Sequence, residues 1–171
     1  FPPGEEGGNG LADILTGKSN PGGRLPVTLP RSVGQIPNYT GTRAGGDRAM
    51  FFNDYIDSPT TPLFPFGHGL SYTTFAYENF VVQGESTDKP IELSIEVRNT
   101  GERAGDEVVQ LYCRDHVASV ARPQRILLGF ARVSVEPGQA RRVTFRVHPS
   151  RIAFYDPQMR FVTEPGDFTF S

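Results

Sequence analysis

The most constraining feature of this sequence is a series of short segments in which apolar and polar residues alternate. Residues 91–99 (IELSIEVRN) place four aliphatic side chains on one side and polar ones on the other, the pattern of a half-buried strand. The same pattern recurs in residues 107–114 (EVVQLYCR) and 141–147 (RRVTFRV), and turn sequences such as NTGE and EPGQ separate the segments. The full set of predicted strands is 77–83, 91–99, 107–114, 125–135, 141–147, 152–155, 160–162 and 167–170. Short strands with turns at this spacing predict a mainly β fold, a β-sandwich of the immunoglobulin or fibronectin type III kind.

The first 75 residues differ in composition from this strand-rich part. They hold 13 of the 19 glycines and 9 of the 15 prolines. One helix is predicted over residues 5–17, with Leu11, Ile14 and Leu15 on one face, and one short strand over residues 24–29 (RLPVTL). Residues 31–62 have no sustained periodicity and predict a long loop. Because one helix and one strand cannot bury a core, we expect them to be a remnant of an α/β domain.

Charge and cysteine content exclude several classes of partner and site. The formal net charge is −2, so neither a nucleic-acid nor a membrane partner is expected, and no apolar run is long enough to span a bilayer. The single cysteine, Cys113, rules out an internal disulfide, and its phase in the alternating pattern predicts a buried, unreactive thiol. Acidic and basic side chains are interspersed in the following positions, which predicts an ion-paired surface: Glu102, Arg103, Asp106, Glu107, Arg114, Asp115, Arg122 and Arg125.

Several long stretches resemble family 3 glycoside hydrolases. Residues 3–30 (PGEEGGNGLADILTGKSNPGGRLPVTLP) resemble the end of that family's α/β sandwich domain. Residues 62–75 (PLFPFGHGLSYTTF) resemble the linker into its C-terminal domain. The stretches that resemble its fibronectin type III-like domain are 99–115 (NTGERAGDEVVQLYCRD), 122–147 (RPQRILLGFARVSVEPGQARRVTFRV) and 152–156 (IAFYD). The resemblance therefore implies the C-terminal portion of a β-glucosidase or β-xylosidase type of enzyme.

The resemblance also implies a division of the chain. Residues 1–32 correspond to the tail of the α/β sandwich domain, residues 33–75 to a linker and docking loop, and residues 76–171 to the fibronectin type III-like domain. Because the last predicted strand runs to Ser171, we expect this domain to be truncated at its end. Members of the family are secreted, periplasmic or cytoplasmic, so the resemblance leaves the compartment open.

The resemblance implies an enzyme with a retaining mechanism that uses two carboxylates. These are an Asp nucleophile on an N-terminal barrel and, in many members, a Glu acid/base on the α/β sandwich. Both positions lie upstream of the stretch that this chain resembles, so we expect no catalytic residue, metal or cofactor here and no activity from this segment alone. The implied partners are the barrel and the rest of the α/β sandwich of the same enzyme, and an oligosaccharide or aryl glycoside as substrate of the whole enzyme. A homodimer is a further partner left open.

Three acids are candidates for positions near the substrate. Glu5 and Glu6 precede the predicted helix, where first-turn acids are also favoured by the helix dipole. Adjacent residues point to different sides, so they do not form the facing pair that a retaining mechanism needs. Asp54 lies in an aromatic-rich stretch, residues 51–59 (FFNDYIDSP), of the kind that can approach an active-site mouth.

The stretch LFPFGHGLSY, residues 63–72, raises the question of a site at His68. This histidine has no neighbouring metal ligands and does not lie in a nucleophile motif, so a structural role is favoured. We predict that the stretch docks the sandwich onto the enzyme body, its glycines bending the backbone and its apolar side chains burying area. The predicted docking residues are Phe64, Phe66, Gly67, Gly69, Leu70 and Tyr72.

Two alternatives stay open from the sequence. The chain can be a carbohydrate-binding module acting through exposed aromatic rings, although it has no tryptophan. It can also be a dimerisation module that uses the loop at residues 38–60 or a sheet edge.

Overall fold

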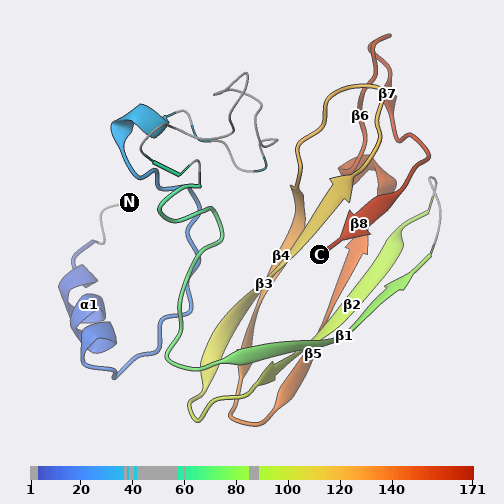
Figure 1. Ribbon diagram of the computed structural model, residues 1–171. Helices are drawn as coiled ribbons and strands as arrows, with labels where there is room; N and C mark the ends of the chain where they lie inside the picture. Colours follow the sequence, from blue (N-terminus) through green and yellow to red (C-terminus); the bar gives the residue numbers. More distant parts are fainter. Residues whose placement is uncertain (1–3, 37, 39–40, 42–57, 60, 85–88) are drawn as a thin grey trace.

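The computed structural model describes residues 4–36, 38, 41, 58–59, 61–84 and 89–171. The second half of the chain forms a β-sandwich, and the first half lies beside it as a helix followed by extended segments (Figure 1). The fold is mainly β, as the alternating pattern predicts.

Two antiparallel three-stranded sheets make the sandwich. The first has the order β1 (Phe75–Gln83), β2 (Ile91–Asn99), β5 (Ala140–Val147), and the second has the order β4 (Ile126–Val135), β3 (Gly105–Asp115), β8 (Phe168–Phe170). A short 3-10 helix, η2 (Pro149–Arg151), leads into a hairpin of β6 (Phe154–Tyr155) and β7 (Phe161–Val162). The predicted strand at residues 152–155 is thus shorter than expected, and η2 precedes it.

The core lies between the two sheets, on the faces that the alternation assigns inward. Its fully buried side chains include Leu93 and Val97 of β2 and Leu111 and Cys113 of β3. The remaining buried aliphatic and aromatic residues are Val109, Leu128, Val135, Val143, Val147, Ile152 and Phe154. Alternation predicts burial here because every second side chain of a strand points to the same face.

Cys113 is 1 % exposed, and burial, with a smaller contribution from the nearby Asp115 carboxylate, raises the pKa of its thiol to about 11. Thiolates, not thiols, react with alkylating agents. We therefore expect iodoacetamide at pH 8 to leave the folded chain unlabelled and to label it rapidly in urea, as measured by intact mass. Because the unfolded thiol ionises near pH ~8.5, its contribution to stability is complete below that pH and is lost as the pH rises towards 11. Equal labelling rates with and without urea would contradict this assignment.

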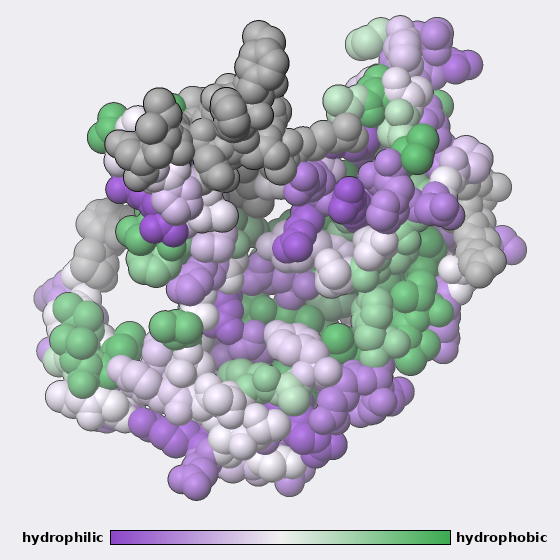
Figure 2. All heavy atoms as spheres, viewed as in Figure 1, coloured by the Kyte–Doolittle hydropathy of each residue, from purple (hydrophilic) through white to green (hydrophobic). Residues whose placement is uncertain are grey.

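Among the described residues of the first half there is one α-helix, α1 (Gly7–Leu15), within the predicted range 5–17. None of its residues is buried, and Leu11 and Leu15 are 58 % and 74 % exposed. Figure 2 shows hydrophobic side chains gathered at the surface over α1. A second short element, η1 (Val33–Gln35), is a 3-10 helix.

The prediction of a strand at residues 24–29 is wrong. Only Leu29 makes a β-type bridge, with Phe64, while Leu25 exchanges backbone hydrogen bonds with Gly67 and His68. Pro26 has no N–H group and interrupts the pairing between these two contacts.

Strand β1 is an edge strand with an interrupted register. Its pairing with β2 shifts between Glu78 and Val81, and Asn79 adopts a positive φ of 54° at this bulge. Phe80, Val81 and Val82 follow it and are each a little over two-fifths exposed. In the described part of the chain, no helix is long and apolar enough to cross a membrane.

Candidate functional site

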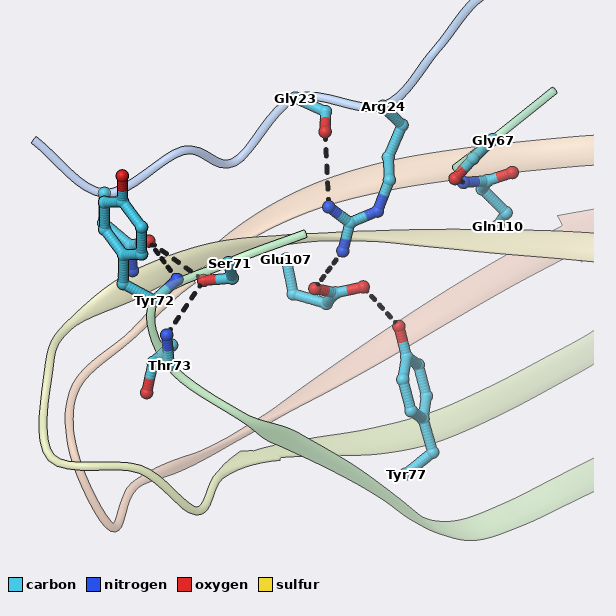
Figure 3. A network of polar contacts seen from close by, with 10 residues as sticks. Gly23, Arg24, Gly67, Ser71, Tyr72, Thr73, Tyr77, Glu107 and Gln110 are labelled. Carbon is cyan, nitrogen blue, oxygen red and sulfur yellow. Dashed lines mark hydrogen bonds and ion pairs between the residues drawn. The ribbon is translucent and has the colours of Figure 1, made fainter. Parts of the chain in front are cut away.

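The two halves of the chain meet at a polar interface that we call the junction. It consists of residues 17–25 and 62–73 from the first half and of residues 99–110, at the end of β2 and the beginning of β3, from the sandwich. Figure 3 shows its central contacts. The stretch around His68 lies in this junction.

An ion pair between Arg24 and Glu107 joins the halves. The Arg24 Nη2 atom lies 2.5 Å from Oε2 of Glu107, and both side chains are largely buried, with 14 % and 7 % exposed. The hydroxyl of Tyr77, on β1, donates to Oε1 of Glu107 at 2.7 Å. Burial, and then the hydrogen bond to the Glu107 carboxylate, raise the pKa of Tyr77 well above its usual value, so its hydroxyl stays a donor. One carboxylate thus ties together three separate segments (Figure 3).

A second set of contacts centres on Asn20. Its amide nitrogen donates to the carbonyl of Ala104 at 3.1 Å, and its side-chain oxygen accepts from the Ser71 hydroxyl and the Tyr72 N–H. Arg103 donates to the carbonyl of Gly17 at 2.6 Å. Residues 17–20 are therefore held on the sandwich by hydrogen bonds.

The side chain of Asn99 forms hydrogen bonds with backbone groups at the end of β2. It is fully buried, and its amide nitrogen donates to the carbonyls of Arg103 and Val135 at 2.7 and 2.8 Å. Its side-chain oxygen accepts from the Thr73 hydroxyl at 2.7 Å and from the Gly101 N–H at 3.0 Å. One side chain thereby fixes the end of the linker, the turn after β2 and the end of β4.

The two glycines predicted to take part in docking, Gly67 and Gly69, lie where segments of the junction approach each other closely. Gly67 has a positive φ of 81°, and its carbonyl accepts from the Gln110 amide nitrogen at 3.2 Å. A Cβ atom on Gly69 would overlap the carbonyl oxygen of Gly23 and come within 2.9 Å of the Arg24 side chain. Only residues without a side chain let the chain segments of the junction lie this close.

The predicted apolar docking residues lie in the junction but bury little area within the described chain. Leu70 is 75 % exposed, and Phe64 and Tyr72 are exposed as well, while Phe66 is partly buried. The Tyr72 hydroxyl donates to the carbonyl of Ile14 at 2.9 Å. The His68 ring stacks on Phe64 with centroids 4.9 Å apart. Docking by these apolar side chains onto the rest of an enzyme remains a prediction.

The three acids predicted to lie near the substrate are in different positions. Glu6 is the N-cap residue of α1 and accepts from the Asn9 amide at 2.6 Å, and both Glu5 and Glu6 are exposed. Asp54 lies outside the described residues. In the described ranges, no group of three or more His, Cys, Asp or Glu side chains is arranged to hold a metal ion.

The prediction of an ion-paired surface is wrong for two of its members. Glu107 and Asp115 are 5 % and 7 % exposed, because both share the inward phase of β3 with Val109, Leu111 and Cys113. Alternation already assigns them inward, and a charged residue in an inward row is the signal that predicts a buried partner. Asn99 carries a similar signal, because it lies in the inward row of β2 with Leu93 and Val97. Arg24 has no comparable local signal, since its partner lies 83 positions away in the sequence.

Comparison with known proteins agrees with this arrangement. Residues 1–72 match the model of the glycosyl hydrolase family 3 C-terminal domain, and residues 107–171 match that of a fibronectin type III-like domain. A periplasmic beta-glucosidase of Salmonella typhimurium is 40 % identical over 96 % of the chain, and a beta-xylosidase of Formosa agariphila is 39 % identical over 98 %. In each case the chain covers 23 % of the relative.

Solved structures show the same correspondence. A β-glucosidase from Erythrobacter marinus superimposes with a TM-score of 0.90 at 44 % identity, covering 99 % of this chain and 22 % of that protein. The beta-glucosidase from Listeria innocua in complex with glucose gives 0.87 at 32 % identity, covering 98 % and 24 %. The chain thus spans about a quarter of the length of its relatives. It belongs to glycoside hydrolase family 3 and corresponds to the C-terminal portion of these enzymes.

Proposed function

We propose that this chain is the structural, C-terminal part of a β-glycosidase that hydrolyses terminal β-linked glucose or related sugars. The reaction is a retaining one that uses two carboxylates, both outside this chain. The observation that carries the proposal is that relatives named as beta-glucosidases and beta-xylosidases align over nearly the whole chain, across both of its halves.

Two buried acids of the described residues make structural contacts that support a non-catalytic role. The buried carboxylates of Glu107 and Asp156 are held by Arg24 and Arg160, at 2.5 and 2.7 Å. Asp156 also accepts two backbone N–H bonds in the turn between β6 and β7, and these contacts lower the pKa of its carboxyl group. These contacts give both carboxylates a structural role, in keeping with catalytic carboxylates that lie outside this chain.

Within the whole enzyme, we assign residues 1–32 to the α/β sandwich domain, residues 33–75 to a linker and residues 76–171 to the fibronectin type III-like domain. The polar junction holds the sandwich against the chain that precedes it, and the exposed side chains of Phe64, Leu70 and Tyr72 are free to contact the catalytic domains. Glu5, Glu6 and Asp54 are proposed to lie near the substrate of the complete enzyme.

One observation favours a second role in carbohydrate binding. Tyr155 and Phe161 form an exposed ring pair on the β6–β7 hairpin, with centroids 5.2 Å apart. Exposed aromatic rings are the groups on which sugars stack. A binding titration of the 171-residue chain with β-glucan oligosaccharides separates this role from the structural one.

An activity assay tests the principal proposal. We expect the full-length enzyme to release the aryl group from an aryl β-glucoside or aryl β-xyloside, with retention at the anomeric carbon by NMR. The folded 171-residue chain should give no turnover, because it lacks both carboxylates of the pair. Turnover by this chain alone, or an inactive full-length enzyme on every aryl β-glycoside, contradicts the proposal.

A further inference from the structure

We infer that Glu107 makes the sandwich depend on the segment before it, so that the sandwich is an obligate partner of residues 17–25 and not an independent module. The carboxylate belongs to the sandwich and is buried at the junction, whereas its cationic partner, Arg24, comes from the first half of the chain. This inference does not rest on the proposed glycosidase activity.

The position of Glu107 is one that an apolar residue would ordinarily take. It shares its strand face with Val109, Leu111 and Cys113, which are at most 3 % exposed, and is itself 5 % exposed. Its register partner on β4 is Val133, which offers no charge. The polar groups that face it are the Arg24 guanidinium from the first half and the Tyr77 hydroxyl from β1.

A buried carboxylate needs a partner far more than an exposed one does. Taking a charge out of water is costly, and an ion pair offsets this cost only while both members are present. Removing the cation alone therefore leaves an uncompensated charge buried at the junction, while replacing both members by apolar side chains of similar size does not. This asymmetry distinguishes dependence on Arg24 from an ordinary favourable contact.

A neighbouring ion pair supplies a matched control. Asp106, the residue before Glu107, pairs with Arg132 on β4, but here the side chains are 30 % and 62 % exposed. Exposed pairs of this kind contribute little to stability. Any effect specific to Glu107 should thus be absent at Asp106.

The experiment compares urea midpoints of the 171-residue chain and four variants: R24M, E107M, R24M/E107M and R132M. We expect R24M to have the lowest midpoint, the double variant to recover the greater part of that loss, and R132M to stay close to the parent. Failure of R24M to fold while R24M/E107M folds supports the inference equally. An R24M midpoint equal to that of R132M, or a double variant no more stable than R24M, overturns it. Because the readout is stability, a failed glycosidase assay leaves this result unaffected.

Discussion

Replacing Asn99 by alanine should lower the free energy of unfolding by about 3 kcal/mol, an effect at the high end for a single substitution. The variant leaves two carbonyls, one N–H and one hydroxyl without the partner that this buried side chain supplies. Each buried polar group left unpaired costs on the order of 1–3 kcal/mol, partly recovered where water enters. Urea unfolding followed by circular dichroism measures the loss.

The adjacent Thr100 provides the control for this prediction. Its exposed hydroxyl pairs with the exposed Thr74 hydroxyl at 2.8 Å. Thr100→Ala should therefore change stability by less than ~0.5 kcal/mol. Equal losses in the two variants would show that Asn99 does not organise the end of the linker.

The Gly69→Ala variant should be destabilised by about 1–3 kcal/mol through overpacking. The added methyl group overlaps the backbone oxygen of Gly23 and presses on the Arg24 side chain, so residues 23–24 must move away from the sandwich. The same movement lengthens the Arg24–Glu107 ion pair. The measurement is a urea midpoint together with hydrogen exchange at the Leu25 amide, which bonds to the His68 carbonyl at 2.8 Å.

Gly23 is the matched control for the glycine prediction. It lies on the other side of the same contact, and a Cβ atom there would meet nothing within 4 Å. Gly23→Ala should leave the midpoint unchanged or slightly raised, since alanine restricts the unfolded chain. If Gly69→Ala behaves in the same way, the close approach at Gly69 does not constrain the junction.

The sandwich could be predicted from the sequence because its signal is local. The pattern over residues 91–99 coincides with β2 (Ile91–Asn99), and the inward row of β3 is the one that alternation assigns. The predicted strand ends are less accurate where pairing with a neighbouring strand decides them. Strand β1 begins at Phe75, two residues before the predicted start at residue 77, because Phe75 pairs with Asn99. The strand predicted at residues 24–29 failed for a related reason, since strand-like residues form a strand only where a partner accepts their backbone groups.

The junction could not be predicted because its contacts join residues far apart in the sequence. Arg24 and Glu107 are 83 positions apart, and no pattern around either names the other. The stretch at residues 63–72 was identified as a docking element by its composition. The prediction emphasises its aromatic side chains. In the structure this stretch is held in the junction by backbone groups, by the close approach of two glycines and by polar contacts, one of them from the Tyr72 hydroxyl. Composition indicates which groups are available, and only the folded arrangement decides which of them meet.

The bulge at Asn79 has a consequence for how copies of this protein coexist in solution. An edge strand with a regular ladder and exposed apolar side chains is a template on which a second chain can add a strand. Strand β1 has such side chains at residues 80–82, but the register shift beside them spoils the even spacing of hydrogen-bonding groups that an incoming strand requires. We therefore expect the bulge at Asn79 to disfavour the addition of a second chain at this edge.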